Sequence, residues 1–146
     1  MYIYESEHLK ESDLFKIEEC GKRSLPIYYN YHHLQKFKIG NKQKIWVIKD
    51  IDNVYGFIIF EFKSPSHIHI LSLAIDTSYR QKSLASHLMS HLKKKYTDFK
   101  ITLYVQVSNL PAINFYVKHL FKMTKFLPHY YDNLSMPEAY EMTYLK

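Results

Sequence analysis

The stretch from His67 to Val107 decides the fold, because it reads as a strand, a helix and a second strand. Residues 67–75 (HIHILSLAI) run as a β-strand, and residues 83–95 (SLASHLMSHLKKK) repeat leucine at helical spacing. Residues 101–107 (ITLYVQV) form a second, buried strand. Two strands joined in this way lie parallel, with a right-handed crossover. The stretch therefore predicts an α/β fold.

The flanking segments add strands and helices to this unit. Ser12 suits the N-cap of a first helix and Gly21 its C-terminal stop. Helices are expected at residues 12–21 and 30–40 and from Pro111 to Leu120, and further strands at residues 1–4, 44–50, 54–63, 123–130 and 139–145. The order β, α, α, β, β, β, α, β, α, β, β predicts a mixed sheet.

The length of 146 residues predicts a single domain over residues 1–146. The one cysteine, Cys20, cannot form an internal disulfide, and residues 1–12 are too polar for a secretory signal. We therefore expect a cytoplasmic protein. No apolar run approaches the roughly 20 residues that span a bilayer, so no membrane association is expected.

The formal net charge of +6 favours anionic partners, such as nucleic acid, acidic lipid or a phosphorylated cofactor. Only three glycines occur in the sequence. They cannot supply a Walker loop or the glycine-rich dinucleotide fingerprint. P-loop and Rossmann enzymes are therefore excluded.

A basic turn, Arg80 to Lys82, stands between the first strand and its helix. The free N–H groups at a helix N-terminus bind anions, and the two cations would add charge for a pyrophosphate. The alternative is a solvated surface turn.

The second strand ends at Ser108 and Asn109, and Pro111 then starts a helix that carries Tyr116. If this strand lies beside the first, both strand ends open onto one crevice, where open α/β sheets bind ligands. The alternative for Tyr116 is a core aromatic with its hydroxyl at the surface.

These motifs resemble those of the GNAT-family acetyltransferases, most of all the protein N-terminal acetyltransferases of the NatE type. RQKSLA at residues 80–85 occupies the family's Arg/Gln-x-x-Gly-x-Gly/Ala signature, with Ser83 in place of the first glycine. The resemblance implies a mixed, mostly antiparallel sheet with splayed parallel strands 4 and 5 and four flanking helices. It also implies acetyl-CoA as donor and no metal.

The resemblance assigns roles to individual residues. The strand end at residues 73–75 would pair with the pantetheine arm, the turn at residues 80–85 would wrap the pyrophosphate, and Tyr116 would hydrogen-bond the leaving sulfur. The implied donor-binding residues are Leu73, Ala74, Ile75, Arg80, Gln81, Lys82, Ser83, Leu84, Ala85, Asn109, Ala112 and Tyr116. Because Ser83 brings a side chain close to the phosphates, we expect weakened donor binding.

The acceptor site is implied by two further motifs. Leu25, Pro26, Ile27 and Tyr29 resemble the NatE-type loop that receives the first residue of the substrate, with Leu25 where an aromatic is usual. Tyr130 and Tyr131 resemble the tyrosine pair of its hairpin. His69 stands where the family has its catalytic tyrosine, and Tyr104 stands where the family has its catalytic histidine. Either residue could therefore be the base. With Tyr116, the implied catalytic residues are His69, Tyr104 and Tyr116.

The resemblance therefore implies an N-acetyltransferase acting on protein N-termini, of the type that begins with methionine and an apolar residue. An auxiliary subunit or ribosome association is possible, and DNA is not an expected partner. The alternatives are acetylation of a small-molecule amine or a lysine side chain, a non-catalytic GNAT subunit, and a basic RNA-binding module.

Three other features have ordinary structural interpretations. His87 and His91 stand at helical spacing, but the residues between them lack the glutamate of a zinc-protease helix, and His67 and His69 share one face of a strand. Cys20 has no nucleophile motif around it and suits a buried position. The Lys93–Lys95 run suits a helix C-terminus better than nucleic acid.

Overall fold

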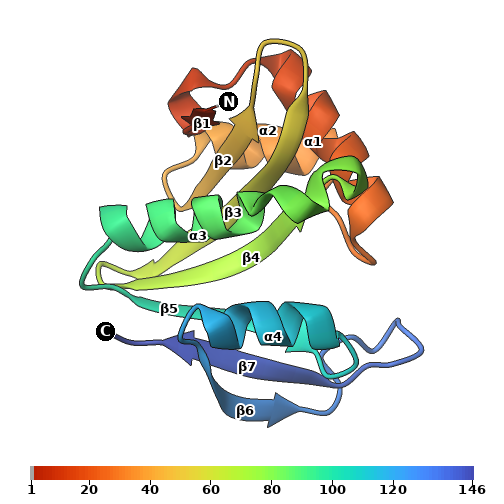
Figure 1. The fold of residues 1–146 in the computed structure, drawn as a ribbon, viewed down its shortest axis with the longest axis vertical. Helices are drawn as coiled ribbons and strands as arrows, with labels where there is room; N and C mark the ends of the chain where they lie inside the picture. The colour runs from red at the N-terminus through yellow and green to blue at the C-terminus, as the bar shows by residue number, and fades with distance from the viewer. Residues whose placement is uncertain (1) are drawn as a thin grey trace.

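The computed structural model describes residues 2–146, except for the side chains of Gln81 and Lys82. Its elements in chain order are β1 (Tyr2–Tyr4), the short 3-10 helix η1 (Ser6–His8), α1 (Glu11–Ser24), α2 (Tyr31–Ile39), β2 (Gln43–Lys49), β3 (Val54–Ser64), β4 (His67–Ile75), the 3-10 helix η2 (Thr77–Lys82), α3 (Leu84–Lys95), β5 (Lys100–Gln106), α4 (Leu110–Lys118), β6 (Lys122–Leu127) and β7 (Ala139–Tyr144). Figure 1 shows how they are arranged.

The strands form one seven-stranded sheet in the order β1-β2-β3-β4-β5-β7-β6. Each neighbouring pair is antiparallel except β4 and β5, which are parallel. The predicted α/β fold, with its crossover from β4 through α3 to β5, is confirmed. The single domain over residues 1–146 stays a prediction.

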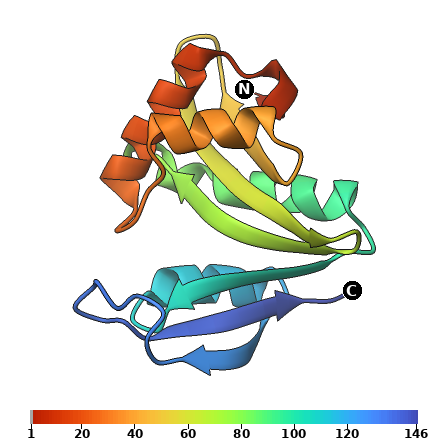
Figure 2. The ribbon, with the colours of Figure 1, turned by 180° about the vertical axis from the view of Figure 1, so that it is seen from behind.

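Helices cover the sheet on both sides. The helices α1 and α2 pack on β2, β3 and β4, while α3 and α4 lie on the opposite side (Figures 1 and 2). Seen from behind, no helix of the described chain lies over β5, β7 and β6 (Figure 2). One side of this part of the sheet is therefore open.

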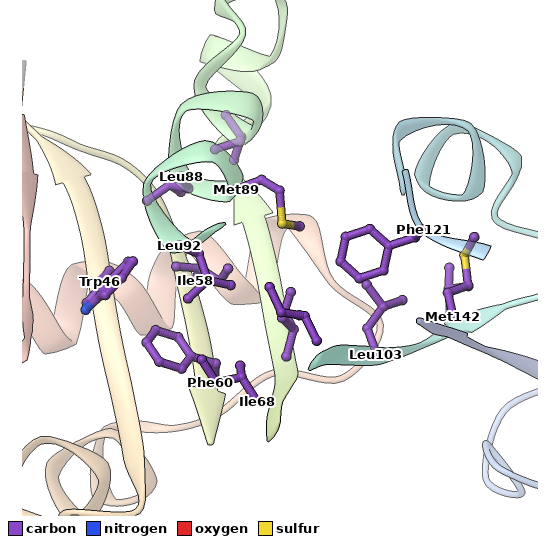
Figure 3. Close-up of a cluster of buried hydrophobic side chains, with 14 of the residues drawn as sticks. Trp46, Ile58, Phe60, Ile68, Leu88, Met89, Leu92, Leu103, Phe121 and Met142 are labelled. Atoms are coloured by element: carbon purple, nitrogen blue, oxygen red, sulfur yellow. The ribbon is translucent and has the colours of Figure 1, made fainter. Parts of the chain in front are cut away.

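Two buried clusters hold the layers together. The larger lies on the α3 side and extends from Trp46 through Leu88 to Met142 (Figure 3). The second lies under α1 and α2 and includes Leu14 and Leu34. Burying one such side chain contributes about 1.5–3 kcal/mol, so these two clusters stabilise the arrangement of helices on the sheet.

The parallel strands pair over only part of their length. Residues 67–70 of β4 pair with residues 100–103 of β5. The register of β4 against β3 then shifts at Leu71, and the rest of β4 pairs with β3 while the rest of β5 pairs with β7. Each strand keeps its outer neighbour, so the strand ends separate without losing their place in the sheet. This is the expected splay.

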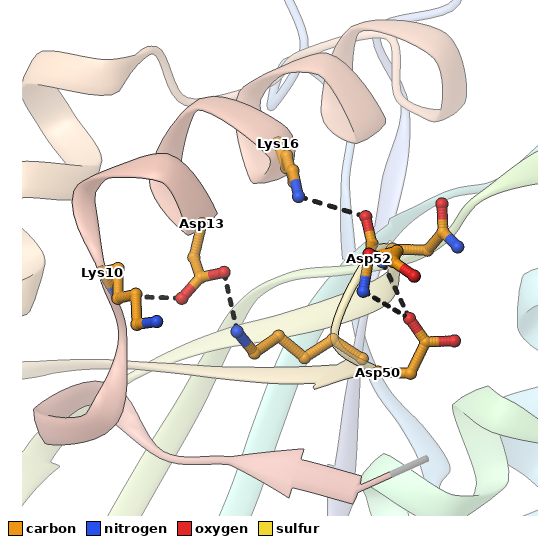
Figure 4. Close-up of polar contacts among 7 residues, drawn as sticks. Lys10, Asp13, Lys16, Asp50 and Asp52 are labelled. Carbon is orange, nitrogen blue, oxygen red and sulfur yellow. Dashed lines mark hydrogen bonds and ion pairs between the residues drawn. The ribbon is translucent and has the colours of Figure 1, made fainter.

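Asp13, and not Ser12, fixes the start of α1. The Asp13 carboxylate accepts the backbone N–H of Lys10 at 2.8 Å and the Lys49 ammonium at 2.9 Å (Figure 4). Nearby, the ammonium of Lys16 donates to the backbone oxygen of Asp52 at 3.1 Å. The helix begins at Glu11. The N-cap predicted at Ser12 is wrong. Lys10 is the N-cap, and the carboxylate of Asp13, the third residue of the helix, accepts hydrogen bonds from both the Lys10 N–H and the Lys49 ammonium.

Gly21 lies inside α1 and does not end it. The helix continues to Ser24, and the N–H of Leu25 donates to the Gly21 oxygen at 2.9 Å. A Cβ at Gly21 would lie 3.0 Å from the Cβ of Tyr28. The predicted stop is therefore wrong: the glycine allows the segment after the helix to pack closely against it.

The chain after α4 differs from the prediction at one strand. β6 ends at Leu127, so Tyr130 and Tyr131 lie in the turns between β6 and β7.

The longest described helix, α1, has 14 residues, and none of the described helices is long and apolar enough to cross a bilayer.

Replacement of Gly56 tests how closely β3 packs against the end of β4. It pairs with Ile75, and a Cβ at this position would lie 2.7 Å from the Ala74 oxygen. We expect Gly56→Ala to lower the free energy of unfolding by about 2 kcal/mol, since backbone must move. The control is Gly40→Ala, at the end of α2 with a φ of −82°, where the nearest atom to a new Cβ is the Lys36 oxygen at 3.1 Å, and we expect a change below about 1 kcal/mol. Equal denaturation midpoints for both variants would contradict this packing argument.

Candidate active site

A cleft of about 390 Å³ opens where β4 and β5 separate. Its walls come from the segment after α1, from the inner edges of both strands, from the start of α4 and from the turns before β7. The lining residues are Leu25, Pro26, Ile27, Tyr29, Ile70, Leu71, Ser72, Leu73, Leu103, Tyr104, Val105, Gln106, Asn109, Ala112, Tyr116, Tyr130 and Tyr131. Segments far apart in sequence therefore meet in one hollow.

Most of the residues predicted for the acceptor and the donor lie around this cleft. Those that line it are Leu25, Pro26, Ile27, Tyr29, Leu73, Tyr104, Asn109, Ala112, Tyr116, Tyr130 and Tyr131. Ile70, Leu71 and Ser72 also line the cleft, at the point where the register of β4 shifts, and no sequence motif pointed to them.

The other predicted residues do not line the cleft, and these include His69, Arg80 and Ser83. Ala74, Ile75 and Leu84 are buried in the core, and Ala85 packs against it. The side chains of Gln81 and Lys82 lie outside the described residues. The roles implied for residues 74–75 and 84–85 involve the main chain, so burial of these side chains does not conflict with them.

Ser83 adopts the backbone conformation of a glycine. Its φ of 58° and ψ of 26° are left-handed, and among the described residues no side chain caps the N-terminus of α3. A Cβ makes this conformation unfavourable by about 1–2 kcal/mol. The position therefore needs the local geometry that the signature glycine provides, and the Ser83 hydroxyl leaves the helix N–H groups uncapped.

The turn from β4 to α3 is held by side chains from both sides. The Ile75 oxygen accepts Arg80 Nε at 3.3 Å and Ser24 Oγ at 3.4 Å. Asp76 accepts the N–H of Ser78 at 3.1 Å and pairs with Arg23 of α1. Although desolvation opposes the shift, the hydrogen bond from Arg23 keeps the pKa of Asp76 below its usual value. Arg80 thus reaches back to the strand end, where its guanidinium also helps to position the turn.

The start of α4 is fixed by Asn109. Its side-chain oxygen accepts the N–H of Ala112 at 3.2 Å, and Pro111 occupies the first turn. This cap aims the N-terminus of α4 at the same end of the sheet as that of α3, as Figure 1 shows. Burial raises the pKa of Tyr116, so its hydroxyl stays protonated and can donate a hydrogen bond.

His69 lies beside Tyr104, with the two ring centres 4.5 Å apart. Its Nδ1 lies 2.7 Å from Thr102 Oγ1, and the side chain is buried. Burial, with the nearby Lys63, lowers the pKa of His69 to about 4. The ring is therefore neutral near pH 7 and keeps a lone pair that can accept a proton.

Tyrosines form the outer wall of the cleft. The Tyr104 and Tyr130 rings lie 4.5 Å apart, and those of Tyr130 and Tyr131 4.7 Å apart. Burial raises the pKa of Tyr131 to about 12 and also raises the pKa of Tyr29 and Tyr130. Their hydroxyls stay protonated near neutral pH and present donors and apolar ring faces to a ligand.

Cys20, the Lys93–Lys95 run and the histidine pairs were the other candidate functional features of the sequence. Burial raises the pKa of the Cys20 thiol to about 11, which leaves it poorly nucleophilic. The Lys93 ammonium donates to the oxygen of His119, and Lys95 pairs with Glu5. No group of three or more metal-ligating side chains occurs among the residues that the structure describes.

Known proteins share the sequence and the fold. Residues 8–121 match the model of the Acetyltransferase (GNAT) family. An N-alpha-acetyltransferase of Saccharolobus solfataricus is 32% identical over 139 residues, which cover 82% of this chain and 80% of that protein. Ard1 of Thermoplasma volcanium is similar in structure, with a TM-score of 0.81 and 26% identity over 99% of this chain and 96% of that one.

A eukaryotic structure shows the same fold. Arabidopsis thaliana Naa50, solved in complex with the bisubstrate analogue CoA-Ac-MVNAL, has a TM-score of 0.79 and 21% identity, with 100% of both chains covered. At this identity the likeness concerns the fold alone. It agrees with the seven-stranded sheet whose parallel strands separate.

Ser83 can be tested by restoring the glycine. We expect Ser83→Gly to raise the free energy of unfolding by about 0.5–1 kcal/mol, because glycine adopts the left-handed conformation without strain. The control is Ser90→Gly, an exposed position inside α3, which we expect to be destabilising by about 1 kcal/mol. Chemical denaturation measures both variants. Destabilisation of the same size in both would show that Ser83 is not strained.

Proposed function

The chain belongs to the GNAT acetyltransferase family, and on that premise we propose that it acetylates the α-amine of protein N-termini with acetyl-CoA as donor. The observation that carries the proposal is the cleft between β4 and β5, which is lined by the start of α4 and by the tyrosines of the turns after β6. The Saccharolobus relative, an N-alpha-acetyltransferase by name, supports the same acceptor class.

The donor half of the cleft fits an extended chain that ends in a diphosphate. The inner-edge backbone of residues 71–74 has no strand partner on the β5 side, so it can pair with an amide-bearing arm, whereas the Ile75 oxygen already accepts Arg80 and Ser24. The uncapped N-terminus of α3 supplies N–H groups for phosphate oxygens. Asn109 and Ala112 line the space between. Weakened donor binding due to Ser83 stays a prediction.

The acceptor half carries apolar and aromatic side chains. Leu25, Pro26, Ile27, Tyr130 and Tyr131 all line the cleft. Such a lining suits an extended peptide whose first side chain is apolar, such as methionine. Leu25 in place of an aromatic gives this wall a smaller side chain than the family pattern has.

An α-amine suits this site better than a lysine side chain. With a pKa of about 7.7–8.0, roughly a fifth of an α-amine is neutral near pH 7.2, compared with about a thousandth of a lysine. The neutral amine attacks the thioester carbonyl directly, and no covalent enzyme intermediate is needed. A weak base is then sufficient, and either His69 or Tyr104 can accept the proton through water.

Tyr116 acts at the leaving group. Tyr116 lines the cleft, and its hydroxyl stays protonated because burial raises its pKa. It can therefore donate a hydrogen bond to the departing sulfur, which lowers the energy of the developing negative charge.

An auxiliary subunit, ribosome association and a cytoplasmic location stay predictions.

A panel of acceptors tests the proposed substrate class. We expect a peptide that begins Met-Leu to be acetylated with kcat/KM about 100-fold above an N-terminally blocked peptide containing lysine, because far more of its amine is neutral. Spermidine and kanamycin represent small-molecule amines. Turnover of either one without turnover of the peptide would favour the alternative acceptor. No binding of acetyl-CoA at millimolar concentration, measured by calorimetry, would remove the acetyltransferase proposal.

Tyr116→Phe tests the role of the hydroxyl. We expect kcat to fall at least about tenfold, with little change in acetyl-CoA affinity, since only the developing thiolate needs the donor. Tyr144→Phe is the control, because Tyr144 lies on β7 outside the cleft and packs against Phe121. Steady-state kinetics and calorimetry measure the two quantities. An unchanged kcat would rule out this role for Tyr116.

A further inference from the structure

Two histidines meet at one threonine on the open side of the sheet. Thr102 Oγ1 lies 2.7 Å from His69 Nδ1 and 2.8 Å from His67 Nε2. The parallel register pairs His69 directly with Thr102, and His67 lies two residues before His69 on β4. Thr102 is 3% exposed and His69 is 5% exposed, whereas His67 is half-buried. The three side chains thus lead from a buried ring to one nearer the solvent.

A hydroxyl has one hydrogen, so Thr102 can donate to only one of the two rings. It must accept an N–H from the other ring if both hydrogen bonds exist. When His69 donates from Nδ1, its Nε2 is left with the lone pair, and Thr102 donates to His67 Nε2. The tautomers of the two histidines are therefore coupled through a single oxygen.

Nε2 of His69 keeps contact with solvent. No buried side-chain nitrogen or oxygen among the described residues lacks a hydrogen-bond partner, and Nδ1 alone of this ring bonds a protein atom. Nε2 therefore keeps some exposed surface, and although His69 does not itself line the cleft, its ring lies beside that of Tyr104, which does. The Nε2 edge of the His69 ring, where a proton would be accepted, and the Nδ1 edge that contacts Thr102 are different edges of the same ring.

We propose that His69, Thr102 and His67 form a relay that carries the proton of the acceptor amine from the cleft to the solvent. This inference rests on the proposed function, because the amine must lose a proton when it is acetylated. Thr102 and His67 act through His69 and are positioning residues, while His69 is the group that receives the proton.

Each group in the relay gains one proton and loses one proton, so the transfer needs no further reactant. Nε2 of His69 gains a proton from the amine through water, and Nδ1 gives its own proton to Thr102 Oγ1. The Thr102 hydroxyl hydrogen passes to Nε2 of His67, which releases one proton to the solvent. Rotation of the hydroxyl and tautomer exchange of the two rings then restore the starting arrangement.

The surroundings favour transfer over storage of the proton. Burial makes a charged His69 unfavourable, and a reacting peptide would fill the cleft through which water enters. The charged groups facing the two rings are Glu61 and Lys63 of β3, Lys100 of β5 and Glu141 of β7. Burial and Lys100 lower the pKa of His67, which therefore releases a proton readily near neutral pH.

Nitrogen NMR of the imidazole rings in the full-length, ligand-free chain tests the arrangement independently of turnover. We expect both His69 and His67 to carry their proton on Nδ1. We also expect the His69 tautomer to become mixed in Thr102→Val, which removes the hydroxyl, and to persist in Thr102→Ser. A wild-type His69 protonated on Nε2 would overturn the relay.

Kinetics with a Met-Leu peptide supply the second test. We expect Thr102→Val and His67→Gln to lower kcat about tenfold, with KM nearly unchanged and the loss partly restored by higher buffer concentration. Thr102→Ser should keep most of the activity. Thr143→Val is the matched control, since Thr143 pairs with Thr102 from β7 but bonds Thr124.

The outcomes separate the relay from the proposed function. Wild-type turnover with unchanged kcat in His67→Gln and in the threonine variants would overturn the relay alone. No peptide turnover by the wild type would overturn the proposed function, and the NMR result would still decide whether the bridged pair exists. If Thr102→Val fails to fold, His67→Gln and Thr102→Ser carry the kinetic comparison.

Discussion

The separation of β4 from β5 after Ile70 and Leu103 is the constraint on which the rest of the site depends. A parallel pair that loses its hydrogen bonds leaves two rows of unpaired backbone groups, which is unfavourable unless something else binds them. Here each strand keeps an antiparallel neighbour on its outer side, β3 for β4 and β7 for β5. The sheet therefore stays intact while its middle opens. Leu71 supplies the shift in register at the point where the gap begins.

A close backbone contact at Gly56 and a left-handed residue at Ser83 shape the open edge. Gly56 lets β3 approach the end of β4 closely, and Ser83 turns the chain into α3 with a left-handed backbone. Between them, the Ile75 oxygen is held by side chains from α1 and from the turn. The orientation of the α3 N-terminus thus depends on contacts made on the far side of β4 as well as on the local turn.

Sequence patterns were sufficient for the fold and for most of the cleft. Apolar periodicity identified β4, α3 and β5, and Tyr116, Tyr130 and Tyr131, which the resemblance named, all line the cleft, while their roles stay predictions. The ends of α1 were missed because the carboxylate that caps the helix, Asp13, also binds Lys49, a partner 36 residues away, and because Gly21 allows close packing inside the helix. The Thr102 bridge could not be foreseen either, since it depends on the exact register of β4 against β5. Pattern shows which faces are buried, whereas register decides which polar atoms touch.

The two halves of the cleft are built from different kinds of structure. The β4 end and the helix N-termini belong to the sheet, whereas Tyr130 and Tyr131 stand in the turns after β6, and Leu25 to Ile27 follow the end of α1. Loop residues tolerate replacement better than residues in a packed sheet. Acceptor preference can therefore diverge among descendants of this chain through changes in two short connections, while the common donor continues to bind an unaltered scaffold.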